Sequence, residues 1–186
     1  MPYYHASPVS GIKTLEPRVS NHGTPLIYFS EKRENVLVYL SNAGEKCCRE
    51  NGFSYDGIWQ KWASYGFDKD GILRLEEYWP DALRETYAGV SGYIYRVDTL
   101  PDAAPTPGVP RSFTVSSPVA VDSVEFIPDA YEAILAAVEA GLIRILRYEE
   151  TGEKMRAWIE KAVRSEYAEA AAHPEYRFFL EKKFGL

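Results

Sequence analysis

The chain has 186 residues, enough for one domain with a sizeable core, and its 46% hydrophobic and 26% charged residues are ordinary for a globular protein. Its formal net charge of -6 disfavours nucleic acid and anionic membranes as partners, because both attract basic surfaces. The only cysteines are the neighbours Cys47 and Cys48, which cannot build a disulfide framework. We therefore expect reduced thiols in a cytoplasmic protein.

A membrane partner is also not expected. The start of the chain, Met1-Pro2-Tyr3, lacks the basic and then apolar region of a signal peptide. The most apolar helical pattern, over residues 133–146, is interrupted by Glu139, Gly141 and Arg144. Such a segment is too polar to span a bilayer.

The first forty residues predict two short β-strands. Residues 3–7 and 26–30 are rich in aromatic and β-branched side chains, and each segment ends in polar groups that an ordinary core strand does not need. Residues 31–42 carry apolar side chains at helical spacing, which predicts a helix with Ser30 as its N-cap. Capping and a role in a site both remain open for Ser30.

The middle of the chain predicts short strands joined by turns. Residues 44–66 give no clear pattern, and residues 11–17 and 20–25 suggest connecting segments. Residues 67–72, with Glu77, resemble a calcium loop, but the first ligand position is Gly66 and Arg74 occupies a later one, where a cation repels calcium. A turn before a strand is therefore predicted. The remaining predicted elements are a strand over 72–76, a helix over 80–87, strands over 92–97, 112–115 and 119–127, and an extended Pro-rich loop over 98–110.

The last third of the chain predicts helices. Asp129 followed by Glu132 is typical of a helix N-terminus. The expected buried stripe of this helix is Tyr131, Ile134, Leu135, Val138 and Leu142. A strand over 143–148, a helix from Thr151 and a final helix from Pro174 to near Phe184 follow. The order predicts an α+β fold, with a strand-rich body at 1–127 and a helical extension at 128–186 packed on the same domain.

Common catalytic motifs do not occur in the sequence. There is no Gly-x-Ser-x-Gly elbow, phosphate-binding glycine loop or dinucleotide fingerprint. The three histidines, His5, His22 and His173, and the two adjacent cysteines match no metal-ligand spacing. His22 and His173 are expected in solvent. A lone histidine at the end of an aromatic strand, such as His5, is a structural residue roughly twice as often as a site residue.

Two short motifs resemble the ADP-ribosyltransferase superfamily in its histidine-tyrosine branch, which includes poly-ADP-ribose polymerases and rifampicin ADP-ribosyltransferases. His5-Ala6-Ser7 is similar to the His-Gly-Ser of the polymerases' first strand, and Ile27-Tyr28-Phe29-Ser30 is similar to their Gly-x-Tyr-Phe-Ala pattern. Residues 92–97, the Pro-rich loop and residues 112–119 resemble the strand order of the rifampicin enzymes. The resemblance covers residues 3–127, in an ADP-ribosyltransferase-like body, and not 128–186.

The resemblance implies NAD as a substrate and no metal cofactor. It places His5 on the ribose, and Ala6 where the family's glycine presents backbone groups to the carboxamide of nicotinamide. Tyr28 and Tyr39 match tyrosines that pack against nicotinamide, although Tyr39 also reads as an ordinary helix aromatic. The NAD-binding residues that we expect are His5, Ala6, Ser7, Tyr28, Ser30 and Tyr39.

The family's catalytic carboxylate has no clear match. Active members place Glu or Asp on a late strand or loop, where it stabilises an oxocarbenium-like transition state. This chain has Ser116-Ser117 at that position. By analogy with the rifampicin enzymes, Asp102 is the best substitute, and Asp102 or Ser117 would occupy the catalytic corner. Asp98 and Glu125 are weaker candidates.

Three functional hypotheses follow from these patterns. The first is an enzyme that transfers ADP-ribose from NAD to an unknown acceptor and releases nicotinamide. The second is a catalytically inactive domain that binds NAD, ADP-ribose or a protein partner. The aromatic residues that could present a partner surface are Trp158, Tyr167, Tyr176 and Phe179. The third hypothesis treats the two motifs as ordinary core strands and leaves the function open.

Overall fold

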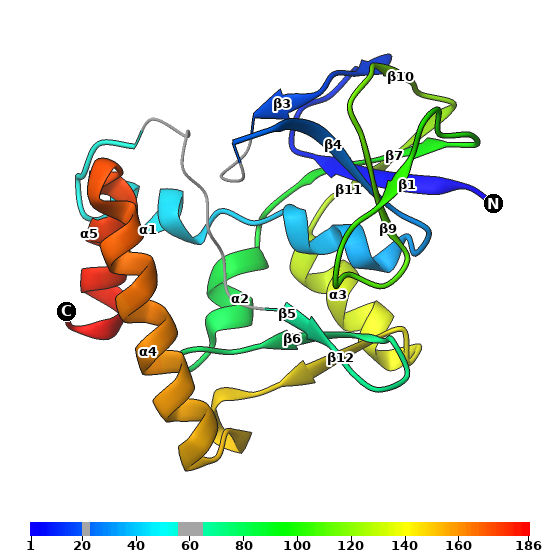
Figure 1. The fold of residues 1–186 in the computed structure, drawn as a ribbon. Coiled ribbons are helices and arrows are strands. Elements are labelled where there is room, and N and C mark those ends of the chain that lie inside the picture. Colours follow the sequence, from blue (N-terminus) through cyan, green and yellow to red (C-terminus); the bar gives the residue numbers. More distant parts are fainter. Residues whose placement is uncertain (20–22, 56–64) are drawn as a thin grey trace. The chain divides into compact units, whose positions relative to one another are not determined.

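The computed structural model describes residues 1–19, 23–55 and 65–186. Helices and antiparallel strands together form an α+β fold, as the sequence predicts (Figure 1). The chain divides into two compact units by its internal contacts. The first unit contains Met1–Ser41, Phe67–Leu73 and Ala88–Arg144, and the second contains Asn42–Gly66, Arg74–Tyr87 and Ile145–Leu186.

The first unit is built on a seven-stranded antiparallel sheet with the order β11-β7-β1-β4-β9-β8, in which β3 also pairs with β4. The strands of this sheet are β1 (Tyr3–Ser7), β3 (Arg18–Val19), β4 (Pro25–Ser30), β7 (Gly92–Val97), β8 (Ala104–Pro105), β9 (Ser112–Val115) and β11 (Ser123–Ile127). The predicted strands at 3–7, 92–97 and 112–115 are confirmed at their bounds. The strand predicted at 26–30 begins one residue earlier.

Two predictions about the first unit's strands are wrong. The supposed connector at 11–17 contains β2 (Thr14–Leu15), which pairs with β10 (Val119–Ala120). The single strand predicted at 119–127 is divided into β10 and β11. The division occurs because the Val121 N–H donates to the Lys13 carbonyl while the Asp122 N–H donates to the Arg96 carbonyl, so successive residues follow different partners.

The helix predicted over 31–42 is also wrong. This segment forms only η1 (Glu34–Tyr39), a 3-10 helix whose residues Val36, Leu37 and Val38 are all buried. Three consecutive buried side chains do not fit one face of an α-helix, and β-branched valines have low α-helix propensity. Ser30 does not cap η1, since its hydroxyl accepts from the Lys32 N–H at 3.0 Å in a local turn.

The two faces of the first unit's sheet are covered by different residues. One face carries a buried apolar cluster of Leu15, Ile27, Phe29, Tyr95, Val97, Val115 and Val119. The opposite face lies against η1, which contacts β1 and β4, and against Leu40 just after it, since a Cβ added at Gly92 would meet a Leu40 methyl at 2.5 Å. The helix α3 (Ala130–Glu139) packs against η1. Side chains therefore pack on both faces of the sheet near β1 and β7.

The N-terminus of α3 confirms the predicted cap. The Asp129 carboxylate accepts hydrogen bonds from the backbone N–H groups of Tyr131 and Glu132. Tyr131 and Ile134 are buried as expected. Leu142 is 42% exposed, because the helix ends at Glu139 and the predicted stripe does not continue.

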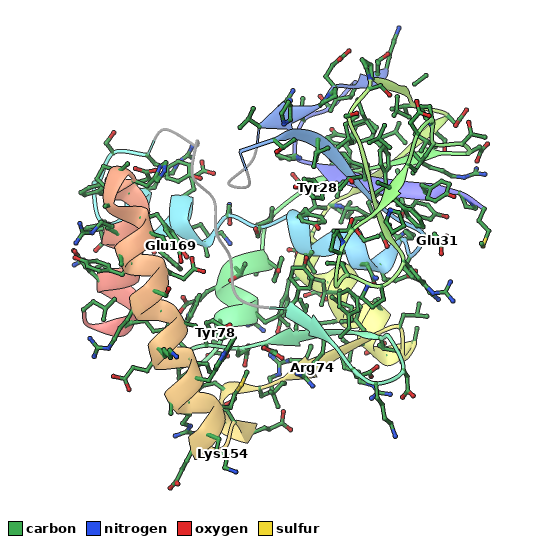
Figure 2. The ribbon with its side chains drawn as sticks, in the orientation of Figure 1. Tyr28, Glu31, Arg74, Tyr78, Lys154 and Glu169 are labelled. Carbon is green, nitrogen blue, oxygen red and sulfur yellow. The ribbon has the colours of Figure 1, made fainter. Side chains whose placement is uncertain are left out.

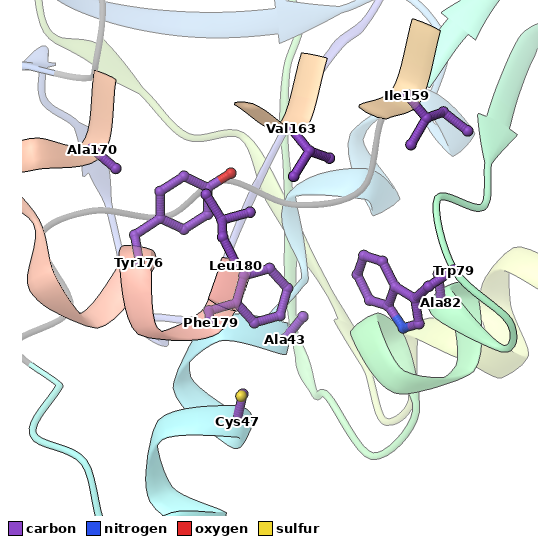
Figure 3. Packing of buried hydrophobic residues seen from close by; sticks show 10 residues of the cluster. All are labelled: Ala43, Cys47, Trp79, Ala82, Ile159, Val163, Ala170, Tyr176, Phe179 and Leu180. Carbon is purple, nitrogen blue, oxygen red and sulfur yellow. The ribbon is translucent and has the colours of Figure 1, made fainter. Parts of the chain in front are cut away.

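The second unit is helical. Its helices are α1 (Ala43–Glu50), α2 (Ala82–Tyr87), η2 (Tyr148–Glu150), α4 (Glu153–Glu169), η3 (Ala170–Ala172) and α5 (Pro174–Phe184). The predicted bounds of α5 are confirmed, whereas α1 lies where the sequence gave no clear pattern. Figure 3 shows the apolar cluster shared by α1, α2, α4, η3 and α5, in which Phe179 of α5 packs against Trp79. Cys47 and its neighbour Cys48 are free, buried thiols.

Glu77 forms a buried polar junction in the second unit. Its side chain is 2% exposed. The carboxylate accepts from the Leu83 N–H at 3.0 Å, from Arg147 Nη1 at 3.1 Å and from the Tyr148 N–H at 3.3 Å. One carboxylate thus joins the first turns of α2 and η2.

Three short strands, β5 (Tyr65–Phe67), β6 (Leu73–Glu76) and β12 (Ile143–Leu146), occur where the chain passes from one unit to the other. The turn predicted before β6 is confirmed. Asp68 Oδ1 accepts from the N–H groups of Asp70 and Ile72 at 2.8 and 2.9 Å.

Among the residues described, no helix has the length and apolar content needed to cross a bilayer.

Candidate functional site

The strands β1 and β4 separate soon after they meet. β1 pairs with β7 at all five of its residues, but with β4 at only one position, Tyr4 opposite Ser30. Among the described residues, 5–7 of β1 therefore have no pairing partner on β4. We call residues 5–7 of β1 and the facing residues 27–29 of β4 the β1–β4 split.

The His5 side chain, and not the main chain, joins β1 to β4 just beyond their one paired position. Its Nδ1 lies 2.9 Å from the Tyr28 carbonyl oxygen. Because a carbonyl only accepts, Nδ1 must carry the hydrogen, and in the neutral ring Nε2 is then an acceptor. No described group is hydrogen-bonded to Nε2. This atom is available to accept a hydrogen bond from a ligand hydroxyl.

The environment of His5 favours its neutral form. Burial is the largest effect and lowers the pKa of His5 from its usual 6.5; the hydrogen bond to Tyr28 acts in the opposite direction, and the Arg18 charge lowers the pKa further. The ring also lies beside Phe29, with 5.9 Å between centroids. A neutral, oriented imidazole is therefore the expected state near pH 7.

We expect His5 to make the stability of the protein depend on pH. Since its folded pKa lies below 6.5, the unfolded chain binds more protons in acid, and the stability that His5 contributes is full above pH 6.5 and is lost as the pH falls towards the folded pKa. Urea unfolding of the wild type and of His5→Phe between pH 5 and 8 measures this. The free energy of unfolding should rise with pH less steeply in His5→Phe than in the wild type, by up to about 1.4 kcal/mol per pH unit. Equal slopes would contradict the assignment.

Tyr28 contributes its backbone to His5, and its ring lies elsewhere. Its neighbours Ile27 and Phe29 belong to the buried cluster, so strand alternation directs the Tyr28 side chain to the other face of the sheet. Figure 2 labels Tyr28 on β4 and Glu31 just after that strand. Tyr39 is 38% exposed on η1, which packs against β1 and β4.

The other expected NAD-binding residues remain close to His5 along the strands. Ala6 is buried on β1. The Ser7 hydroxyl accepts from the Val9 N–H at 3.2 Å, which holds the end of the strand in a turn. Ser30 is buried opposite Tyr4. The structure thus brings the His5 ring to the main chain of Tyr28, and Ala6 and Ser7 follow His5 along β1.

The expected catalytic residues belong to other segments of the first unit. Asp102 is exposed in a left-handed conformation (φ 49°) before β8, and Ser117 is half-buried between β9 and β10. Neither residue is linked to His5 by any hydrogen bond or ion pair among the described residues. The weaker candidates are occupied: Asp98 pairs with Arg96 at 2.6 Å, and Glu125 pairs with Arg33 at 2.5 Å.

Two features of the site had no signal in the sequence. The separation of β1 from β4 depends on pairing between distant segments, and no local pattern reports it. The influence of Arg18 on His5 likewise depends on the pairing of β3 with β4. Of the histidines expected in solvent, His173 is partly buried, 3.8 Å from a Glu175 carboxylate oxygen, and His22 lies outside the described residues.

Metal binding gains no support from the geometry. Within 1–19, 23–55 and 65–186, no three His, Cys, Asp or Glu side chains gather in a group that could hold a metal ion.

Comparisons of the chain with models of protein families, with curated proteins and with solved structures find no match. A function is therefore best inferred from the β1–β4 split.

Proposed function

We propose that the protein binds NAD at the β1–β4 split and transfers its ADP-ribose group to an acceptor. The observation that carries this proposal is the split itself, where residues 5–7 of β1 have no pairing partner on β4 among the described residues, beside a neutral histidine. A carboxamide offers one carbonyl acceptor and an N–H₂ donor, the same pair of groups that a neighbouring strand would offer. The resemblance of His5-Ala6-Ser7 to the family's first strand supports the same ligand.

The chemistry follows from the ligand. His5 Nε2 accepts a hydrogen bond from a ribose hydroxyl and so orients the sugar. The bond between the ribose C1′ and the nicotinamide nitrogen breaks, and its electron pair leaves with neutral nicotinamide. An acceptor nucleophile then bonds to C1′ and loses a proton. Asp102, carried on its loop, supplies negative charge that stabilises the oxocarbenium-like transition state.

The acceptor remains open between a protein side chain and a small molecule, since the net charge of -6 disfavours nucleic acid. We place the activity in the cytoplasm, where the thiols of Cys47 and Cys48 stay reduced.

A second function, binding without catalysis, is favoured because none of the described candidate carboxylates makes a hydrogen bond or ion pair with His5. Because no described carboxylate is bonded to His5, and both Asp98 and Glu125 are paired with arginines, the domain could bind NAD or ADP-ribose without transferring it. Asp102→Asn distinguishes the two functions. In an enzyme, this variant should keep NAD affinity and lose about 100-fold or more in nicotinamide release. In a binding domain, the wild type itself releases no nicotinamide.

NAD binding should depend on His5. Loss of its hydrogen bonds in His5→Ala is expected to weaken NAD binding by about 10- to 100-fold, corresponding to about 1.4–2.8 kcal/mol. Isothermal calorimetry with NAD and with ADP-ribose measures this, together with nicotinamide release. His173→Ala is the matched control and should bind as the wild type does. Wild-type affinity in His5→Ala, or no binding of NAD to the wild type, would overturn the proposal.

A further inference from the structure

The strand β11 leaves one edge of the first unit's sheet open. Within the described part of the chain, it pairs only with β7, from Ser123 opposite Arg96 to Ile127 opposite Gly92. No backbone hydrogen bond from its other side is made to any described residue. An unpaired edge is a template for another strand, and soluble proteins usually protect it with lysine, proline or a bulge.

β11 carries apolar side chains where such protection is expected. Val124 is 56% exposed and Phe126 is 55% exposed. Both lie on the same face of the strand, and the Phe126 ring is 5.3 Å from that of Tyr93 on β7. The edge therefore offers unpaired backbone groups next to an apolar strip.

The single charge within β11 is already balanced. Glu125 lies on the opposite face of the strand from Val124 and Phe126. Arg33 binds its carboxylate through two hydrogen bonds, Nε to Oε2 at 2.8 Å and Nη2 to Oε1 at 2.5 Å. If Glu125 of a second copy of the chain came close, each carboxylate would keep its own Arg33, and the two guanidinium groups would offset the repulsion between the carboxylates.

We propose that two copies of this chain associate through β11, paired antiparallel about a two-fold axis with Glu125 opposite Glu125. An antiparallel pair of identical strands is self-complementary, so one patch suffices for both partners. In this register Val124 of each copy lies opposite Phe126 of the other, an aliphatic–aromatic pair that stabilises sheets. The two carboxylates meet between two Arg33 side chains, which makes the charges complementary across the axis.

Other registers fit less well. Residues that face each other across the pair must lie on the same side of the sheet, so the register can change only in steps of two. Moving it one way places Asp122 opposite Phe126, and moving it the other way places Pro128, which has no N–H, opposite Val124. Only the register centred on Glu125 pairs all five residues of β11.

Sedimentation velocity from micromolar to several hundred micromolar protein tests the association. A five-residue strand is smaller than a standard interface, so we expect a concentration-dependent monomer–dimer equilibrium of micromolar or weaker affinity. Phe126→Lys should be monomeric throughout, with unchanged circular dichroism. Val19→Lys, at a 68% exposed position on β3, is the control and should dimerise normally. A wild type that stays monomeric, or a Phe126→Lys variant that dimerises like it, overturns the proposal.

Disulfide cross-linking tests the register. Opposed residues in an antiparallel pair have Cα atoms about 4.5–5.5 Å apart, within the range that a disulfide bridges. Glu125→Cys should therefore form a covalent dimer on mild oxidation, while the native thiols stay buried. Val124→Cys alone should not, but mixed with Phe126→Cys it should. Cross-linking of Val124→Cys alone as fast as Glu125→Cys overturns the register.

Discussion

Replacing Glu77 with alanine is expected to lower the free energy of unfolding by about 3–5 kcal/mol, as breaking a buried ion pair typically does. The carboxylate is 2% exposed and accepts from two backbone N–H groups and from Arg147. Alanine removes all three acceptor contacts at once. It leaves the Leu83 and Tyr148 N–H groups without partners, and each unsatisfied buried donor costs about 1–3 kcal/mol.

Urea unfolding followed by circular dichroism measures the loss at Glu77. Glu77→Gln keeps a carbonyl acceptor without the charge, so its loss of stability should be smaller. Glu149→Ala, an exposed glutamate in the adjacent η2, is the matched control and should change stability by less than about 0.5 kcal/mol. A loss below about 1 kcal/mol in Glu77→Ala would mean that water replaces the carboxylate.

A loss of about 3–5 kcal/mol is also expected for Phe179→Ala, because it removes a large ring from a packed core and leaves a cavity. The Phe179 ring is 3% exposed. It packs edge-to-face on Trp79 with 5.7 Å between centroids, and it stacks with Tyr176 at 6.0 Å. These residues join α5 to the rest of the second unit's cluster.

The cavity explanation for Phe179 predicts a graded series. Phe179→Leu retains most of the volume and should cost less than half as much as Phe179→Ala in thermal or urea unfolding. Lys182→Ala, at an exposed position on the same helix, is the control. If the leucine and alanine variants lost the same stability, the aromatic contact itself, and not the cavity, would be the cause.

Elements with strong local patterns were predicted well from the sequence. β1, β7 and β9 alternate or are β-rich over their whole length, and α5 begins at Pro174 and ends before Gly185, which has a left-handed conformation. The cap at Asp129 is also a local signal. Each of these features depends on a few neighbouring residues, so the sequence alone contains the information.

Features that depend on distant partners were not predicted. Val36, Leu37 and Leu40 have helical spacing, but the structure buries the consecutive residues 36–38 in a 3-10 helix instead. Glu77 follows a strand and would ordinarily be assigned to the surface, since the residues that bind it lie six and about seventy positions away. The β1–β4 split is likewise a property of sheet pairing. For this reason the motif around His5 suggested a ligand, but not the separation of β1 from β4 beside it.

The burial of the two cysteines provides a probe that separates the units. Burial, the largest cause, raises the pKa of Cys48 to about 11, so hardly any reactive thiolate forms while α1 remains packed. Both thiols of the chain belong to the second unit. The rate at which a thiol reagent labels the native protein therefore reports the opening of that unit alone, free of any signal from the sheet that carries His5.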